Sequence, residues 1–227
     1  AKNIQSVLKK ILLEKNMEVE LKFLVKDKLA RDRILQDNYL DELVQEGSRE
    51  EIQMKAVYFD TESMELCGKK MTFRVRLENG KPVATLKWGE NSENGLHIRG
   101  ELNVHVEENF MNSPNLSVFK GSQIYGELAE IAADKELRPL MEVEYMRKQM
   151  MVDTGKSISV VSLDVGEVRT SAGSSDISEL EIELYSGDRD DMVEMGRRLA
   201  SKYNLKESDL SKFQRGLAVI GKENLCD

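Results

Sequence analysis

Charged residues recur at every second position along several segments of this 227-residue chain, and the residues between them are mainly apolar. The pattern begins with Glu18, Glu20 and Lys22. It continues through Arg74, Arg76, Lys87, Arg99, Glu101, Asp164, Glu179, Glu181 and Glu183. A period of two places such side chains on one face of a β-strand. Bases and acids are therefore expected to project from the same side of successive strands.

These two sets of side chains call for opposite kinds of ligand if their faces are enclosed. Two unit charges 4 Å apart interact by about 4 kcal/mol at an effective dielectric constant near 20, so desolvated lysines and arginines need anions beside them. Phosphate oxygens match the guanidinium fork best. Clustered carboxylates need cations, and all-oxygen ligands favour Mg²⁺ or Mn²⁺ over zinc. A phosphate chain with a divalent metal satisfies both sets together.

Alternation and turn residues predict the elements that carry these side chains. Strands are expected near 17–23, 52–60, 70–78, 82–88, 97–107, 141–152, 158–165 and 177–185, with a hairpin turn at Asn79-Gly80 and a polar loop at 89–95. Helices are expected over 1–15, 27–46 and 122–137, and from Asp188 or Asp190 to about 203, before a closing segment at 210–219.

Two arrangements explain the charged faces. They could face solvent on the outside of a β-sandwich as exposed ion pairs, each of which contributes little to stability. Alternatively, the sheet closes on itself, with apolar faces outward under the helices and charged faces lining a lumen. Three amphipathic helices need apolar surface to cover, which favours closure. We therefore expect an α+β fold, an antiparallel closed β-tunnel of about eight strands with helices packed outside. It would form a single domain over 17–227, after an N-terminal helical extension over 1–16.

One strand carries charges on both faces. Arg147 is out of phase with Glu142 and Glu144, so all three cannot face inward without a bulge. We keep Arg147 as the inward residue and treat the two glutamates as structural.

Bulk composition narrows the class of protein. Hydrophobic residues make up 40% and charged residues 33% of the chain, and the net charge of −8 argues against nucleic acid as the main partner. No apolar run is long enough to span a membrane, and no signal-peptide pattern opens the sequence. Two cysteines give no disulfide framework. The expected location is therefore the cytoplasm. A homodimer remains open.

The order of the motifs resembles the CYTH superfamily, the triphosphate tunnel metalloenzymes. Glu18-Val19-Glu20-Leu21-Lys22 resembles its ExExK signature. The other matches follow in family order: Tyr58-Phe59-Asp60-Thr61, Arg74-x-Arg76, Leu86-Lys87, Arg99-x-Glu101, Glu181-Ile182-Glu183-Leu184 and Leu210-Ser211-Lys212-Phe213. The likeness spans about Met17 to Arg215. The superfamily includes class IV adenylyl cyclases, thiamine triphosphatases and inorganic triphosphatases.

The resemblance implies roles for individual residues. It implies metal binding by Glu18, Glu20, Glu101, Asp164, Glu181 and Glu183. It implies triphosphate binding by Lys22, Arg74, Arg76, Lys87, Arg99, Arg147 and Lys212. Glu20 and Lys22 are the expected catalytic pair, with Glu20 orienting the attacking water through Mg²⁺ or Mn²⁺. The pattern does not decide which two of Glu179, Glu181 and Glu183 contact metal.

The resemblance leaves three functions to compare. The first is metal-dependent hydrolysis of inorganic tripolyphosphate or a nucleoside triphosphate. The second is a class IV adenylyl cyclase that makes cyclic AMP from ATP, and the third is a non-catalytic polyphosphate-binding module. The complete set of acids weighs against the third. The absence of an obvious aromatic and amide cluster for adenine weighs against the second. Aromatic residues at 6% also offer little for the ring of thiamine triphosphate.

Overall fold

The computed structural model describes residues 16–132 and 135–222. The predicted helical extension over 1–16 lies outside the described residues, apart from Asn16.

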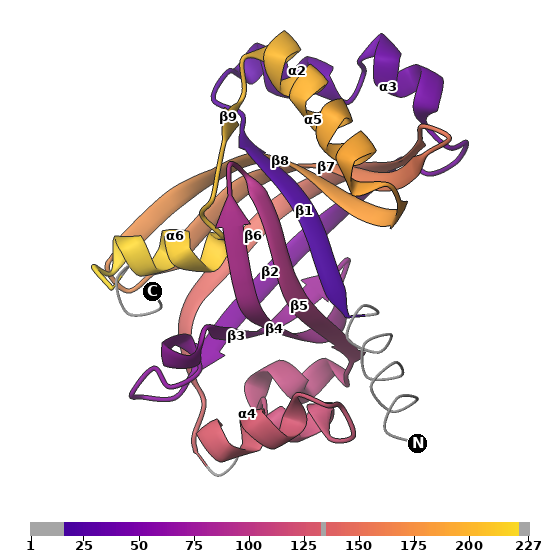
Figure 1. Cartoon of the computed structure of the whole chain (residues 1–227). Helices are drawn as coiled ribbons and strands as arrows, with labels where there is room; N and C mark the ends of the chain where they lie inside the picture. Colours follow the sequence, from indigo (N-terminus) through magenta and orange to yellow (C-terminus); the bar gives the residue numbers. More distant parts are fainter. Residues whose placement is uncertain (1–15, 133–134, 223–227) are drawn as a thin grey trace, which may run out of the picture.

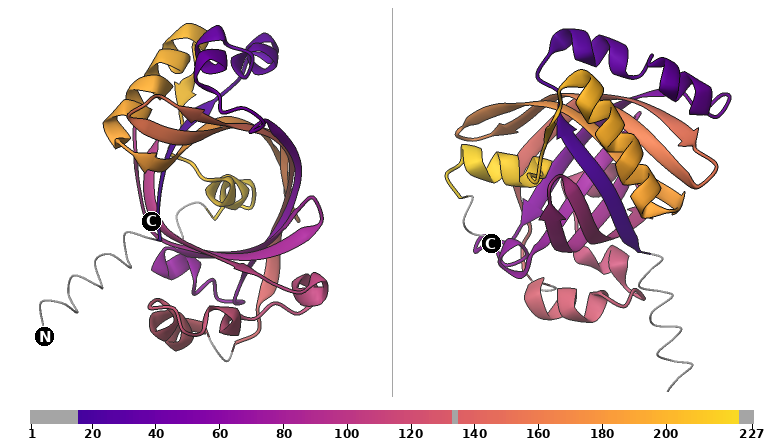
Figure 2. Two further views of the ribbon diagram at one scale, coloured as in Figure 1. Left: turned by 90° about the vertical axis from the view of Figure 1, so that its right-hand side faces the viewer. Right: turned by 45° about the horizontal axis from the view of Figure 1, so that its top comes forward.

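Within the described residues, eight antiparallel strands close into a barrel (Figures 1 and 2). They are β1 (Met17–Leu24), β2 (Glu50–Asp60), β3 (Met71–Glu78), β4 (Lys81–Glu93), β5 (Leu96–His105), β6 (Arg138–Asp153), β7 (Ser157–Thr170) and β8 (Gly173–Gly187). The order around the barrel is β1-β5-β4-β3-β2-β6-β7-β8, and β1 closes the ring by pairing with both β5 and β8. A short β9 (Lys206–Glu207) pairs with the end of β1. The predicted closed tunnel is confirmed.

Strand β1 shows how the sequence pattern sorts side chains between the two faces. Glu18 lies opposite Arg99 on β5, and Lys22 lies opposite Glu181 on β8, so these charges share the inner face. The alternate residues Leu21 and Phe23 are buried on the outer side, in a hydrophobic cluster with helix α5 (Arg189–Tyr203). Burying one apolar face while the other carries charge is what period-two alternation predicts.

Four helices cover the outside of the barrel within the part of the chain that the structure describes. Helices α2 (Lys28–Ile34), α3 (Asn38–Leu43) and α5 lie on one side (Figure 1). Helix α4 (Tyr125–Ala132) lies on the opposite side with the short turns η2 (Glu108–Asn112) and η3 (Leu116–Phe119). The predicted outer helices are therefore confirmed.

Helix α6 (Lys212–Val219) lies differently, at one end of the barrel and within its ring of strands (Figure 2). Its buried Phe213 and Leu217 belong to a hydrophobic cluster with inward-facing residues of the strands, including Tyr58 and Tyr145. A capping box of Ser211 and Gln214 begins the helix. One half of the barrel interior is thus apolar and filled, and the charged residues occupy the other half.

Three predicted elements differ from the structure. The helix expected over 27–46 is two helices, because Asp37 caps α3 by accepting a hydrogen bond from the backbone N–H of Tyr39. The helix expected over 122–137 extends only from Tyr125 to Ala132. The prediction of a loop at 89–95 is wrong, because β4 continues through a bulge to Glu93. Asn94 and Gly95, both with positive φ, make the tight turn.

Two expectations about composition can be compared with the structure. No helix among the described residues is long and apolar enough to cross a membrane. Cys67, which lies in the short turn η1 (Cys67–Lys69), is disulfide-bonded. The number of cysteines therefore does not support the inference of a reducing compartment.

Candidate functional site

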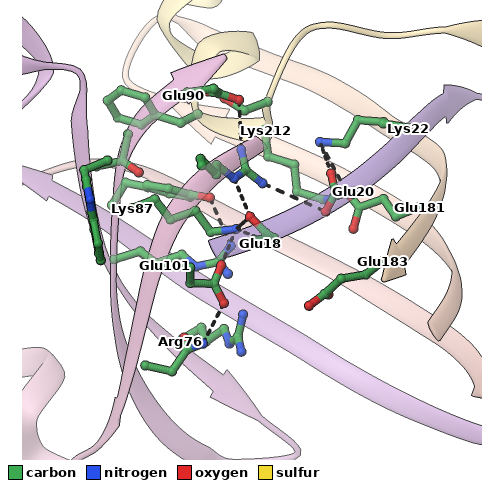
Figure 3. A pocket seen from close by; sticks show the side chains of 18 of the residues that line it. Glu18, Glu20, Lys22, Arg76, Lys87, Glu90, Glu101, Glu181, Glu183 and Lys212 are labelled. Atoms are coloured by element: carbon green, nitrogen blue, oxygen red, sulfur yellow. Dashed lines mark hydrogen bonds and ion pairs between the residues drawn. The ribbon is translucent and has the colours of Figure 1, made fainter. Parts of the chain in front are cut away.

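The charged inner faces of the strands enclose a cavity of about 220 Å³ (Figure 3). Its lining includes most of the residues singled out in the sequence: Glu18, Glu20, Lys22, Arg74, Arg76, Lys87, Arg99, Glu101, Arg147, Glu181, Glu183 and Lys212. The barrel therefore brings together side chains that lie almost 200 positions apart in the sequence. Asp164 and Glu179 are the exceptions, since both lie behind the cavity wall.

Arg74 is a buried cation without a carboxylate partner. It is 9% exposed, and no Asp or Glu side chain of the described residues lies within 4.0 Å of its guanidinium. Within the part of the chain that the structure describes, its one hydrogen bond goes from Nη1 to the Tyr58 hydroxyl at 3.2 Å, and Nε has no acceptor. Burial by itself lowers the pKa of Arg74, but Tyr58, Tyr145 and Glu101 outweigh it, so the guanidinium stays charged. A desolvated charge of this kind requires an anion.

A second group of charges lies where β1, β4 and β5 meet. Lys87 Nζ is 3.0 Å from both carboxylate oxygens of Glu18 and 2.5 Å from Glu101, and Arg99 also donates to Glu18. Burial raises the pKa of Glu18, but Lys87 and Arg99 outweigh it and hold that pKa well below its usual range. Arg99 reaches Glu90 as well, at 2.9 Å. Two bases at this wall are thus shared among three acids.

A third group surrounds Lys22. Its Nζ lies 3.1 Å from Glu20 and 3.4 Å from Glu181, and the side chain is almost completely buried. Burial lowers the pKa of Lys22, but Glu20 and Glu181 raise it above its ordinary value. Lys22 therefore remains protonated, and it holds one carboxylate of β1 next to one of β8.

Helix α6 contributes Lys212 to this part of the site. Its Nζ lies 2.7 Å from Glu181 and 2.8 Å from Asp164, and Asp164 also forms a two-pronged pair with Arg147. Asp164 is completely buried. Both oxygens of Asp164 are thus used to hold two cations that face the cavity, so its place is that of a support behind the wall.

Glu183 is an acid of the lining without an ion pair to any described residue (Figure 3). Burial and the neighbouring carboxylates Glu18, Glu20 and Glu101 raise its pKa to about 7. The end of the cavity near Glu183 therefore carries an excess of negative charge, which a cation would relieve. The donors there are all carboxylate oxygens, the kind that Mg²⁺ and Mn²⁺ prefer.

The acids are not already assembled as a metal cage. Among the described residues, no three Asp, Glu, His or Cys side chains are grouped so that they could hold an ion as they stand. Glu18 and Glu101 are bound to Lys87, and Glu20 is bound to Lys22. The set fits a hard divalent cation in its chemistry, and binding would require these lysines to move towards another anion.

The cavity also contains residues that the sequence did not assign to it. They are Tyr58, Lys70, Thr72, Trp88, Glu90, Asn103, Tyr145, Ser211 and Phe213. Glu90 was missed because its segment was expected to be a loop. The indole of Trp88 lies over Gly100, where any Cβ would come within 2.1 Å of the ring.

His97 is completely buried. Its Nε2 lies 2.9 Å from the Ser208 carbonyl oxygen, and Nδ1 lies 3.0 Å from Glu90. It thereby connects β5 to the segment that leads into α6.

Asp60 explains one of the motifs in structural terms. The carboxylate is buried and accepts hydrogen bonds from the backbone N–H groups of Thr61, Leu66 and Cys67. Asp60 therefore fixes the connection between β2 and β3 and lies outside the cavity lining.

Comparisons with known proteins agree with this architecture. The CYTH domain model matches residues 16–217. The inorganic triphosphatase of Haemophilus influenzae is 28% identical over 170 residues, which are 75% of this chain and 47% of that protein. The chain thus spans about half the length of this relative.

Two solved structures share the fold. HpAC1 from Hippeastrum, a candidate adenylyl cyclase described as having a dominant triphosphatase activity, superposes with a TM-score of 0.67 at 19% identity. The match covers 90% of this chain and 96% of that one. A candidate adenylate cyclase from Bacillus halodurans superposes with a TM-score of 0.56 at 16% identity, over 88% of this chain and 98% of the other.

Proposed function

This chain belongs to the CYTH domain family, and we propose that it binds a triphosphate in the barrel lumen and hydrolyses a phosphoanhydride bond with the help of a divalent metal ion. The activity named for the Haemophilus influenzae relative supports hydrolysis of an inorganic triphosphate. We therefore take tripolyphosphate as the preferred substrate.

The observation that carries this proposal is the unpaired charge of Arg74. Apart from the exposed Lys70, every other cation that lines the lumen has a carboxylate within 4.0 Å, whereas the buried Arg74 has only a tyrosine hydroxyl among the described residues. A phosphate oxygen accepting from Nε would satisfy that buried donor and supply the missing negative charge. A chain of three phosphates would extend from there to Arg76, Lys87 and Arg147.

Glu18, Glu20, Glu101, Glu181 and Glu183 would hold the metal. Once bound, Mg²⁺ or Mn²⁺ would neutralise charge on the phosphate oxygens and make a nearby water more acidic. The negative excess around Glu183 supports this assignment. Asp164 is left out, because Arg147 and Lys212 already use both of its oxygens.

In the reaction, a water oxygen bonds to the terminal phosphorus while the bond from that phosphorus to its bridging oxygen breaks. The electron pair of the broken bond stays on the leaving diphosphate, and the arginines and lysines of the lumen stabilise its charge. We assign Glu20 to orienting the water, because its carboxylate is buried in the lumen and, among the described residues, the nearest cation to its Oε1 is the Lys22 ammonium at 3.1 Å. Lys22 holds Glu20 in place and, with two of its three donors facing Glu20 and Glu181, offers the third to phosphate.

The cyclase alternative requires recognition of a base, and Trp88 and Asn103 are the lining residues that could supply it. The Asn103 amide is already used on both sides: its oxygen accepts from Thr85, and its nitrogen donates to Glu101. Adenine would therefore have to compete with Thr85 and Glu101 for this side chain. Since discrimination among such ligands depends on paired polar contacts, this favours a phosphate substrate without a base.

A phosphate-release screen tests the proposal. The chain would be incubated with tripolyphosphate, ATP, thiamine triphosphate or pyrophosphate, each with Mg²⁺ and with Mn²⁺. We expect the fastest release from tripolyphosphate, and none in EDTA. Equal release in EDTA would contradict the metal requirement, and no release from any of the four would contradict hydrolysis.

A further inference from the structure

Glu179 is a completely buried carboxylate on the inner face of β8, and it holds two cations of helix α6. One oxygen lies 3.1 Å from Lys212 Nζ, and the other accepts from Arg215 Nη2. Lys212 and Arg215 are three positions apart, so they project from the same face of the helix. Glu179 does not line the cavity, which makes it a support for α6.

Arg215 has no part in the site as described so far. It does not line the cavity, and its guanidinium has no carboxylate within 4.0 Å among the described residues except Glu179. A buried ion pair that served only to hold α6 would carry a desolvation cost, and apolar residues of similar size would hold the helix equally well without that cost. The apolar contacts of Phe213 and Leu217 already hold this helix.

The charges around Lys212 balance only when Arg215 is counted. Ion pairs within 3.5 Å link four cations, Lys22, Arg147, Lys212 and Arg215, with four carboxylates, Glu20, Asp164, Glu179 and Glu181. Arg99 lies further away, 3.9 Å from Glu20, and belongs to the neighbouring group around Glu18. Without Arg215 this cluster would be negative by one. Glu179 would then attract Lys212 alone, and the cluster would repel a phosphate chain.

We propose that Arg215 is a positioning residue for triphosphate binding: by neutralising Glu179 behind the wall, it leaves the charge of Lys212 available to the phosphate chain. This inference rests on the proposed function. It assigns a role to a residue that touches neither substrate nor metal. It also separates Glu179 from Glu181 and Glu183, which line the cavity.

The test compares Arg215→Met, Glu179→Gln and the double variant. Binding of tripolyphosphate would be measured by calorimetry in EDTA, so that no turnover is needed. Arg215→Met should weaken binding about ten-fold, the scale of one charge-assisted contact. Glu179→Gln, which leaves the cluster positive, should bind at least as tightly as the unaltered chain. The double variant should return to within about two-fold of it, because the charges balance again.

The opposite signs of the two single variants exclude a merely structural role. If the pair only anchored α6, either change would break the same bridge and both would weaken binding alike, which would overturn the inference. Arg169→Met is the matched control, because Arg169 pairs with Glu144 on the outer face of the same sheet and should not alter binding. If the unaltered chain binds no tripolyphosphate, the proposed function fails and this inference fails with it. If it binds and Arg215→Met binds equally well, only the inference fails.

Discussion

Arg74 is the residue whose surroundings say most about the ligand of the lumen. Lys87, Arg99, Arg147 and Lys212 each have carboxylates beside them, so they could be explained as parts of internal ion pairs. Arg74 lacks such a partner among the described residues and shows a free Nε. A side chain that is unsatisfied in the folded protein and satisfied by a ligand is expected to trade stability for function.

This trade leads to a prediction for Arg74→Met. The loss of a charge-assisted contact with phosphate, worth roughly 1.5–3 kcal/mol, should raise the Kd for tripolyphosphate by one to two orders of magnitude. The melting temperature should stay equal or rise, because a buried unpaired charge is removed. Arg76→Ala should also weaken binding, but less, since Arg76 already pairs with Glu78 at 2.5 Å. Calorimetry and thermal unfolding measure the two effects, and a fall in both stability and affinity would argue for a structural Arg74.

Glu20→Gln should separate catalysis from binding. The change removes one carboxylate charge of the acidic end and leaves every cation of the lumen in place. We therefore expect phosphate release to be lost at saturating Mn²⁺ while tripolyphosphate still binds in EDTA. A variant that keeps full turnover would show that Glu20 is not catalytic.

Glu183 makes stability depend on pH. Its pKa is raised to about 7, so the folded state keeps a proton that the unfolded state releases near pH 4.5. The contribution of Glu183 to the free energy of unfolding is therefore fully present below pH 4.5. It is lost as the pH rises through 7, by at most about 3 kcal/mol. Glu183→Gln should match the unaltered chain at pH 4.5 and be more stable at pH 8. Urea unfolding in EDTA at both values measures this, and a difference independent of pH would contradict the assignment.

At the scale of elements, β6 and β7 come very close together beside Tyr145. Gly166 lies opposite Tyr145, and a Cβ there would come within 2.1 Å of the Glu144 carbonyl oxygen. The contact is with backbone, which cannot move aside as a side chain can. Glycine is therefore required for the two strands to bring Tyr145 and Arg147 to the lumen.

Gly166→Ala should push these strands apart and destabilise the fold by about 1–3 kcal/mol, the range for overpacking. Gly126→Ala is the control, because a Cβ in that part of α4 meets nothing within 4 Å. Alanine in a helix should leave stability unchanged or improve it by up to about 1 kcal/mol. Thermal unfolding of both variants is the measurement, and equal melting temperatures would contradict the close packing.

At the scale of the whole molecule, an eight-stranded barrel has an interior just wide enough for side chains or one small ligand. Helix α6 fills one end of it with apolar residues, so the charged half is left for a ligand (Figure 2). That half is lined mainly by charged side chains. The size and lining of the space together favour a compact phosphate chain.

The products formed from ATP test this molecular view. We expect tripolyphosphate to be cleaved with a higher kcat/KM than ATP, because the residues of the lumen address phosphates and metal. Incubation of ATP with Mn²⁺, followed by chromatography, should yield phosphate or pyrophosphate with a linear nucleotide. If cyclic AMP and pyrophosphate are the main products, the chain is a cyclase and not a hydrolase. The description of the lumen and its charges would still hold.

The sequence by itself determined the strands, their inner faces and most of the site. Alternation with period two is a local property, so Glu18, Glu20 and Lys22 could be placed on one face without knowledge of their neighbours. Arg147 could be separated from Glu142 and Glu144 in the same way. The order of the motifs along the chain was enough to indicate the family.

Only the tertiary structure decided which charges satisfy one another. Pairing of β1 with β5 and β8 brings Lys22 to Glu181, and insertion of α6 brings Lys212 to Asp164 and Glu179. Such contacts depend on strands and a helix that are distant in the chain, and no local pattern encodes them. The bulge that carries Glu90 into the lumen and the glycine that lets Trp88 lie beside it are likewise products of barrel closure. The distinction between Arg74, which lacks a carboxylate, and its paired neighbours therefore became visible only in three dimensions.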